Sequence, residues 1–480
     1  MLFNSLEFLL FLPTVIIVYF LIAHKFRWLW LLAVSYFFYM SWNPKYALLI
    51  LFSSITTYYS GILIEKANYS NLDSKLKKKR KNLYVFLSFS INLSILIFFK
   101  YYNFIGENIN NLFSYFGDDK VVPIIDLLLP VGISFYTFQA LSYTIDVYRG
   151  DIKAQHHFGK YALFVSFFPQ LVAGPIERSS HLIPQFDKKM KFSYKNLYSG
   201  GFIILSGFFK KIVIADRLSV LVNEVYNSPE SHNGYTLLTA TIFFAFQIYC
   251  DFSAYSDIAI GSAKIMGYDL MKNFDRPYFS KSISEFWRRW HISLSTWFRD
   301  YLYFPLGGNR VSKTKFFRNI MIVFLVSGVW HGAEWSFIIW GGLHGMYIII
   351  ENVTQPYINN KLKKYKLLST GYTFLLVSIA WVFFRANSFS DAIYIIKEFF
   401  KINSIEITSK KLVDFNLTLA YMAIVILIIA QILQRKVNLK NYVQKMPLIF
   451  RWSFLIVSIL IIIFWGYYPM KAAEFIYFQF

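Results

Sequence analysis

Two histidines in strongly apolar surroundings are the residues best suited to chemistry. His331 ends an apolar run that begins at Asn319, and it lies in the string GVWHG between Gly328 and Gly332. Imidazole suits proton transfer near neutral pH, and an ionisable group at the end of an apolar run indicates a functional site. A neutral imidazole here could take the proton from an acceptor hydroxyl as that hydroxyl attacks a thioester. The alternative is that His331 is a structural polar residue that bridges two helices, because the glycines on either side of it also permit tight packing between helices.

His291 lies in a more charged string, FWRRWHISLSTWFRD. Glu285 and Arg289 are four residues apart and can pair on one face of a helix, while His291 and Ser295 share another face. This helix carries too much charge to face lipid, so we expect it at the membrane interface or along an aqueous funnel. The alternative is an amphipathic surface helix, to which the tryptophans are well suited.

Two carboxylates also interrupt an apolar helix. Asp251 and Asp257 lie in YCDFSAYSDIAIG, at the end of the run 231–257. Carboxylates placed at membrane depth need partners, and we expect Arg288 or Arg289 to supply them. An interior ion pair that holds helices together explains these residues at least as well as catalysis does.

Other motifs are weaker. The turn at 306–310, LGGNR, could form a backbone nest for an anion, and we assign His344 in GGLHG to helix packing first. No histidine–carboxylate spacing such as H-E-x-x-H or H-x-x-E-H occurs, so no metal site is predicted. A G-x-S-x-G nucleophile elbow is also absent from the sequence.

The elements that must position these residues are membrane helices. The chain has 480 residues, of which 56% are hydrophobic and only 16% charged, against roughly 25% charged in soluble domains. Most of its charge-free runs approach the ~17–25 residues that an α-helix needs to cross a bilayer, and they lack strand-like alternation. The runs are 8–24, 28–44, 46–64, 82–99, 127–145, 161–176, 231–250, 319–333, 335–350, 367–384, 415–434 and 452–470. We therefore predict an all-α polytopic membrane protein with eleven to thirteen embedded segments.

The net charge of +22 is explained by loops rather than by nucleic-acid binding. Loops rich in Lys and Arg stay on the cytoplasmic side. The basic loops are 24–27, 75–81, 310–318, 361–366 and 435–445. This pattern places the N-terminus outside, and residues 1–24 read as a first span because a basic n-region and an A-x-A cleavage site are missing. His331 follows Arg318 by thirteen residues, so a helix lifts it roughly 20 Å into the membrane.

Several segments are predicted to be broken or interfacial. Pro123, Pro130 and Gly132 interrupt one apolar run, and Pro169 interrupts another. Such breaks are tolerated at membrane depth where the backbone lines a cavity or is walled by other helices. The polar segment 180–195 is expected at the interface. The single cysteine, Cys250, rules out an intrachain disulfide and reads as a small apolar filler.

Five strings of the sequence strongly resemble the membrane-bound O-acyltransferase family. They are LPVGISFYTFQALSYTIDVYRG, FFPQLVAGPIER, YCDFSAYSDIAIG, FWRRWHISLSTWFRDYLYFPLGGNR and FLVSGVWHGAEWSFIIWGGLHG. The chain is most similar to the bacterial branch that holds the membrane subunits of alginate and peptidoglycan O-acetylation. The resemblance makes His331, in the W-H-G string, the catalytic histidine and His291 the second family histidine.

The resemblance also implies a fold and a reaction. The fold is a ring of about eleven transmembrane helices, plus re-entrant and interfacial helices, around a central tunnel. One membrane-embedded domain would cover 1–480, with a core at 123–352 and accessory spans at 367–470. The implied donor is acetyl-CoA, or another acyl thioester, on the cytoplasmic side, with no bound cofactor. The acceptor would be a polysaccharide hydroxyl or a periplasmic partner acetyltransferase of the SGNH-hydrolase type, at the bacterial inner membrane.

Within this interpretation the remaining residues divide by role. Arg299 and Arg310 would meet the anionic donor, and His291 would orient a substrate. The full set of expected substrate- and donor-binding residues is Trp290, Ser295, Arg299, Asn309, Arg310, Trp330 and Glu334. The expected structural polar residues are Asp251, Asp257, Arg288 and Arg289.

Three alternative functions remain open at this point. One is the D-alanyl branch of the same family, which takes its thioester from a carrier protein and modifies teichoic acid, although its members are usually shorter. Another is a glycan transporter without covalent chemistry, which predicts charges spread over many spans and repeat symmetry. The third is a scaffold descended from an enzyme.

Overall fold

The computed structural model describes residues 1–117, 121–362, 365–402, 404–409, 414–436, 447–468 and 475–476. Every regular element in these ranges is helical, which confirms the all-α prediction. The chain packs as two compact units, one of residues 1–2, 6–193 and 266–271, the other of residues 3–5, 194–265 and 272–480. The organisation of 1–480 as one domain, with its core and accessory parts, stays a prediction.

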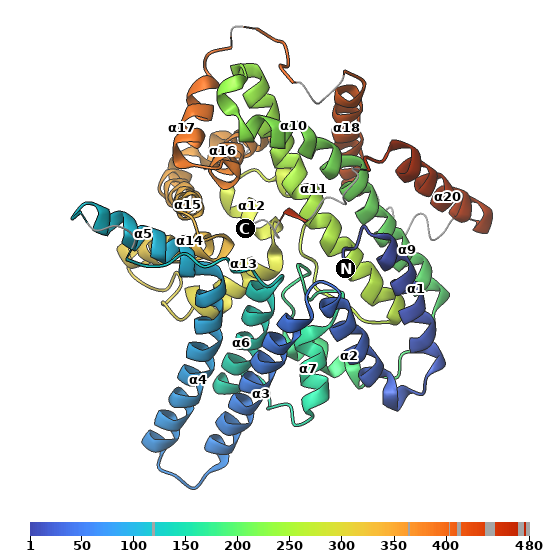
Figure 1. Cartoon of the computed structure of the whole chain (residues 1–480), viewed down its shortest axis with the longest axis vertical. Coiled ribbons are helices and arrows are strands. Elements are labelled where there is room, and N and C mark those ends of the chain that lie inside the picture. The colour runs from blue at the N-terminus through green and yellow to red at the C-terminus, as the bar shows by residue number, and fades with distance from the viewer. Residues whose placement is uncertain are drawn as a thin grey trace. The chain divides into compact units, whose positions relative to one another are not determined.

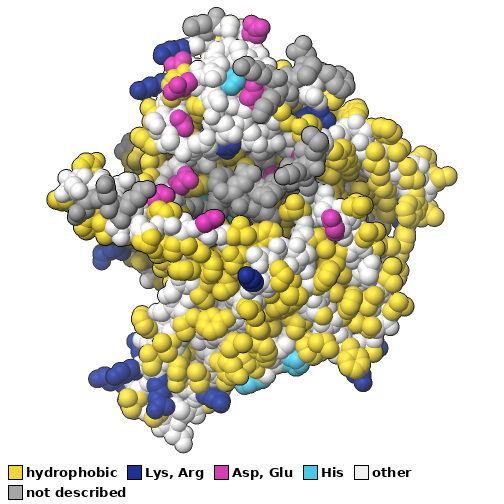
Figure 2. Space-filling view, viewed as in Figure 1, with side chains coloured by type: hydrophobic (Ala, Val, Ile, Leu, Met, Phe, Trp, Pro, Cys, Tyr) yellow, Lys and Arg dark blue, Asp and Glu magenta, His cyan; other side chains and the backbone are white. Residues whose placement is uncertain are grey.

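In the part of the first unit that the structure describes there are eight α-helices, of which α3 and α4 form a long hairpin (Figure 1). They are α1 (Leu6–Leu21), α2 (His24–Met40), α3 (Ala47–Tyr69), α4 (Ser74–Leu96), α5 (Tyr102–Ser114), α6 (Ile133–Arg149), α7 (Phe158–Ser166) and α8 (Ser179–Phe186). Basic side chains gather near the free end of the α3–α4 hairpin (Figure 2). The basic stretch 75–81, which the sequence predicts to be a cytoplasmic loop, lies at this end but forms the first turns of α4.

Buried polar side chains join the helices of the first unit. The Ser53 hydroxyl of α3 donates to Asn92 Oδ1 of α4 over 2.6 Å, and the hydroxyls of Ser88 and Thr144 lie 3.1 Å apart between α4 and α6. Small hydroxyl and amide side chains are typical of interfaces between membrane helices, because they allow close approach and hydrogen-bond across it. These contacts explain why α3, α4 and α6 pack as a group.

The end of the apolar run 82–99 predicts a loop at 100–120, but residues 100–114 are helical. Helix α4 continues through a π-helical turn, η2 (Ile97–Tyr101), into α5. The Asn103 amide exchanges two hydrogen bonds with the backbone of Ile125, and Asn110 does the same with Val122, over 2.8–3.1 Å. These two asparagines of α5 hold the non-helical segment that follows α5 alongside the helix. The pattern of apolar residues could not reveal these hydrogen bonds.

The predicted interruptions at proline and glycine are confirmed. Residues 123–130 form no helix, and α6 begins only after Gly132, whose φ is +75°. A Cβ on Gly132 would lie 2.8 Å from the carbonyl oxygen of Leu171, so both the left-handed backbone and the close approach require glycine. Helix α7 likewise ends at Ser166, three residues before Pro169.

The second unit carries both histidines of interest. Its helices are α9 (Tyr194–Phe208), α10 (Asp216–Asn227), α11 (Gly234–Met266), α12 (Ile283–Arg289), α13 (Ile292–Phe298), α14 (Lys313–His331), α15 (Trp335–Leu362), α16 (Lys366–Arg385), α17 (Phe389–Glu398), α18 (Asp414–Lys436) and α20 (Leu448–Trp465). A π-helical turn, η3 (Phe209–Ala215), joins α9 to α10, and another, η6 (Arg299–Tyr303), follows α13.

Among the described residues, seven helical segments are long and apolar enough to cross a bilayer. They are 44–69, 74–114, 194–227, 234–266, 366–385, 416–435 and 448–465. The chain is therefore a multi-pass membrane protein. The expected number of about eleven membrane helices, their ring and their tunnel stay predictions.

Glycine contacts set the spacing between α9 and α11, and they supply a matched test. A Cβ on Gly200 would lie 2.6 Å from the carbonyl oxygen of Gly261, whereas a Cβ on its neighbour Gly201 would meet nothing within 4 Å. We expect Gly200→Ala to destabilise the fold by about 1–3 kcal/mol, because backbone cannot yield as a side chain does. Gly201→Ala should leave stability unchanged or raise it slightly. The midpoint of thermal unfolding in detergent measures both, and equal midpoints would contradict this packing.

Candidate active site

His331 is the last residue of α14 and is buried against aromatic rings. Its side chain is 3% exposed. The rings of Trp330 and Trp340 lie edge-on at 4.9 Å between centroids, and Phe384 lies at 5.5 Å. These rings come from α14, α15 and α16, so three successive helices build the surroundings of one imidazole. Aromatic walls exclude water, which makes electrostatic and proton-transfer interactions inside them stronger.

The glycines beside His331 serve close packing. A Cβ on Gly328 would lie 2.3 Å from the carbonyl oxygen of Phe337, and a Cβ on Gly332 would lie 2.1 Å from the ring of that same residue. Helices α14 and α15 therefore touch through backbone at the turn that presents the histidine. These glycines thus serve the tight packing that the sequence allows.

His291 occupies a sharp break rather than the middle of a helix. We predicted one helix through FWRRWHISLSTWFRD, but α12 ends at Arg289 and α13 begins at Ile292. His291 between them has φ 43° and ψ 54°, a left-handed conformation that costs a non-glycine residue roughly 1–3 kcal/mol. Such strained residues concentrate at functional sites, where surrounding contacts hold them in place.

Asn273 is the residue that holds this break, and sequence reasoning missed it. Its side-chain oxygen lies 3.1 Å from His291 Nδ1 and accepts from the backbone N–H and the hydroxyl of Ser293, while its backbone oxygen accepts from Ile292 N over 2.9 Å. On the other side its Nδ2 donates to Ser256. Asn273 thus holds both residues that follow His291: Ile292 through its backbone oxygen and Ser293 through its side-chain oxygen. The only signal for it in the sequence is a polar residue shortly after α11.

This arrangement determines the protonation of His291. The backbone N–H of Ser293 is always a donor, so the Asn273 atom that it reaches must be the oxygen. His291 Nδ1 must then carry a hydrogen and donate, which leaves the lone pair on Nε2. Burial of the ring lowers the pKa of His291 to about 3, so the imidazole stays neutral near pH 7.

Trp330 links the two histidines. Its ring lies 4.9 Å from the His331 ring and 6.0 Å from the His291 ring, between centroids. Behind His331, Trp340 stacks on Trp381 at 5.7 Å, and both are fully buried. The two imidazoles therefore belong to one aromatic cluster.

His344 has a packing role, as the sequence suggested. The indole N–H of Trp287 donates to His344 Nδ1 over 3.2 Å, between α12 and α15. The ring of Phe286 stacks parallel to the imidazole at 6.2 Å. This histidine fixes α12 against the helix that follows His331.

The expected substrate-binding residues divide between buried and exposed positions. Trp290 is fully buried, and its backbone oxygen accepts from the Ser295 hydroxyl over 3.2 Å. Arg299 is half exposed and pairs with Asp300 at 2.8 Å. The exposed residues of this set are Asn309, Arg310 and Glu334. Only Trp290 and Trp330 are thus in the aromatic cluster of the histidines, whereas the others are candidates for a rim.

The partners predicted for Asp251 and Asp257 are wrong. Asp257 pairs with Lys210 and Asp251 with Lys211, each at 2.7 Å. Arg289 instead pairs with Glu285 at 2.6 Å, as its four-residue spacing predicted, and Arg288 faces outward. The physical reason is the π-helical turn η3, which begins one residue before the two lysines in the middle of a span. Two adjacent lysines inside an apolar run were the overlooked signal.

Lys211 is the centre of this buried network, so its removal should be costly. It pairs with Asp251 at 2.7 Å and Asp216 at 2.9 Å, and all three side chains are at most 9% exposed. We expect Lys211→Met to destabilise the protein by about 3–5 kcal/mol, because two buried carboxylates lose their cation. Adding Asp251→Asn should recover part of the loss. Detergent-extracted protein yield and unfolding midpoint measure this, with the exposed Lys195→Met as control; an unchanged midpoint in Lys211→Met would contradict the assignment.

The sequence matches known proteins. Residues 152–389 match the membrane-bound O-acyltransferase family. The chain is 41% identical over 397 residues to the probable alginate O-acetylase AlgI of Pseudomonas aeruginosa, across 82% of this chain and 73% of that protein. It is 36% identical over 444 residues to the peptidoglycan O-acetyltransferase of Helicobacter pylori, across 85% and 81%.

A more distant relative comes from the D-alanyl branch. The teichoic acid D-alanyltransferase of Bacillus subtilis is 30% identical over 270 residues, across 54% of this chain and 67% of that protein. The relatives named for O-acetylation thus share more of this chain at higher identity. Together with the all-helical membrane architecture, these similarities establish that the chain is an acyltransferase that belongs to the membrane-bound O-acyltransferase family.

Proposed function

We propose that this enzyme is an O-acetyltransferase of the bacterial cytoplasmic membrane. It takes an acetyl group from acetyl-CoA on the cytoplasmic side and delivers it for O-acetylation of an extracytoplasmic polysaccharide. The observation that carries the proposal is the placement of His331 at the buried end of α14, in one aromatic cluster with His291. The relatives named as alginate O-acetylase and peptidoglycan O-acetyltransferase support the acyl group and the acceptor class.

In the proposed step, His331 acts as the general base. Its unprotonated ring nitrogen accepts the proton of an acceptor hydroxyl as the oxygen attacks the thioester carbonyl. A C–O bond forms, the C–S bond breaks, and the departing CoA thiolate takes up the proton from the imidazolium. The aromatic walls from α14, α15 and α16 keep water from competing for the thioester.

The remaining residues take positioning roles in this proposal. His291, whose Nδ1 is held by Asn273, orients the substrate. Exposed Arg299, Asn309 and Arg310 meet the phosphates of the donor at the cytoplasmic rim, beside the predicted cytoplasmic loop. The acceptor side receives either a polysaccharide hydroxyl or the serine of a periplasmic SGNH-type partner. The N-terminus lies outside the cell in this topology.

D-alanyl transfer to teichoic acid is the second candidate, supported by the teichoic acid D-alanyltransferase relatives. The two candidates differ in the ester that they leave on the envelope. We expect deletion of the gene to remove base-labile acetate from envelope polysaccharide, and reintroduction of the gene to restore it. Chromatography of the acid released by mild base measures acetate and D-alanine separately. Loss of D-alanine with unchanged acetate would overturn the acetyl assignment.

A further inference from the structure

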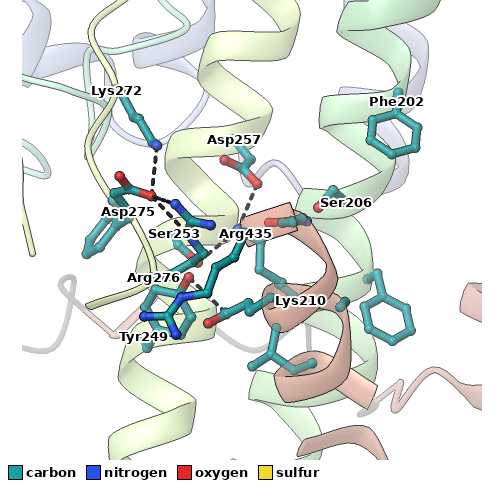
Figure 3. A pocket seen from close by; sticks show the side chains of 16 residues that line it. Phe202, Ser206, Lys210, Tyr249, Ser253, Asp257, Lys272, Asp275, Arg276 and Arg435 are labelled. Carbon is teal, nitrogen blue, oxygen red and sulfur yellow. Dashed lines mark hydrogen bonds and ion pairs between the residues drawn. The ribbon is translucent and has the colours of Figure 1, made fainter. Parts of the chain in front are cut away.

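A pocket of about 560 Å³ lies in the second unit, and neither His291 nor His331 lines it. Its walls come from α9, η3, α11, residues 272–276 and the last turns of α18 (Figure 3). Tyr249 and Phe274 line it and also pack against Trp290, at 6.2 and 5.1 Å between ring centroids. A layer of aromatic rings therefore stands between this pocket and the histidine cluster.

The polar side of the pocket is positively charged. Four cationic side chains and two carboxylates line it, which leaves a formal charge of +2; they are Lys210, Lys272, Arg276 and Arg435 against Asp257 and Asp275. Asp275 is shared by Lys272 and Arg276, each at 3.0 Å, and Lys210 pairs with Asp257 at 2.7 Å (Figure 3). Arg435 instead lies over the ring of Phe279 at 4.5 Å. This guanidinium, exposed at the rim, keeps its charge available for an anion.

The other side of the pocket is apolar. Phe202, Phe209, Leu427 and Ala430 line this side. A ligand that fits both sides must carry a compact anion and an apolar chain.

The position of the pocket along the membrane helices agrees with such a ligand. Helices α11 and α18 run in the same direction, because Phe243 packs on Tyr421 and, further along both, the Gln431 amide donates to the Tyr249 hydroxyl over 3.0 Å. Arg435 ends the span 416–435 and begins a basic loop that we predict to be cytoplasmic. Arg435 thus lies at the level of the cytoplasmic lipid headgroups in this topology, and Lys272 and Arg276 line the same pocket, whereas Lys210 belongs to the middle of the span 194–227.

We propose that this pocket binds an anionic phospholipid of the cytoplasmic leaflet. Its phosphates lie between Lys272, Arg276 and Arg435, and an acyl chain follows Phe202 and Leu427 out along α18. Basic pockets between membrane helices on the cytoplasmic side suit two-phosphate headgroups, and cardiolipin matches the formal charge of +2. The site does not depend on the proposed acyl transfer, because it is tested by lipid binding alone.

The test measures cardiolipin retained by the purified full-length protein in detergent, by native mass spectrometry and by the shift of the unfolding midpoint. We expect cardiolipin to bind and stabilise the protein, and phosphatidylcholine to do neither. Arg435→Ala and Lys272→Ala should each weaken cardiolipin binding about fivefold. Both side chains are exposed, so the folded protein should be retained, and Arg435→Lys should recover most of the binding.

The control is Lys315→Ala, which removes an exposed lysine from another predicted cytoplasmic segment, outside the pocket. It should leave cardiolipin binding unchanged. Equal binding by the native protein, Arg435→Ala and Lys272→Ala would overturn the proposal, as would an equal loss in Lys315→Ala. Displacement of bound cardiolipin by free CoA would also overturn it, because the pocket would then belong to the donor.

Discussion

Replacing His331 with alanine should lower the acetyl ester on envelope polysaccharide by at least about 100-fold, with the membrane abundance of the protein unchanged. A positioned general base contributes roughly 10²–10⁴ to a rate, and the substitution removes the imidazole that packs against Trp330, Trp340 and Phe384. His331→Gln should be equally inactive, because its amide fills the space but cannot accept a proton near neutral pH. Base-released acetate per unit of immunodetected protein measures this loss.

The control for this experiment is another histidine in the same chain. His156 pairs with Glu65 at 2.8 Å, and its side chain is 70% exposed, so His156→Ala should retain full ester. If either His331 variant kept more than half of the native ester at equal abundance, His331 would have no part in the chemistry.

Replacing Asn273 with alanine should lower the rate of transfer about 10- to 100-fold, although Asn273 is placed as a positioning residue. The substitution removes the acceptor that fixes His291 Nδ1–H and the left-handed turn between α12 and α13. Without it the imidazole can adopt the other tautomer, and a misplaced group costs an enzyme orders of magnitude in rate. Asn273→Asp should recover part of the activity, since its carboxylate oxygen accepts the same hydrogen bonds.

Double substitution separates positioning from general damage to the fold. If Asn273 acts through His291, then Asn273→Ala and His291→Ala combined should be no slower than His291→Ala alone. Ser256→Ala is the matched control, because it removes only the acceptor of the Asn273 amide N–H and should change the rate by less than about twofold. Multiplicative losses in the double variant, with the unfolding midpoint unchanged, would contradict the positioning role.

Sequence patterns were sufficient for the elements whose position depends on apolar run length. Helices α16 and α18 begin and end within a few residues of the predicted runs 367–384 and 415–434, and helix α20 begins close to the start of the run 452–470. The proline and glycine breaks around α6 were equally visible, because a left-handed glycine or a proline acts on the backbone directly. The prediction of a loop at 100–120 was wrong, because the hydrogen bonds that hold α5 in place are made to residues that follow it in the chain.

The site was predictable in its chemistry but not in its connections. The strings around His331 and His291 indicated both imidazoles, yet Asn273 could not be selected, because its partners depend on how 272–276 folds against 289–293. The ion pairs of α11 were missed for a similar reason: a π-helical turn changes which faces Lys210 and Lys211 present. Local periodicity assumes regular helices, so it fails where the helix itself is irregular.

Transfer across the membrane through His331 is tested most directly in inside-out membrane vesicles, which expose the cytoplasmic face and keep periplasmic acceptors in the lumen. With labelled acetyl-CoA supplied outside, vesicles with the native protein should accumulate base-labile label on luminal polysaccharide. Vesicles with His331→Ala at equal abundance should accumulate less than about one hundredth of it. Equal luminal label in the two preparations would contradict the account.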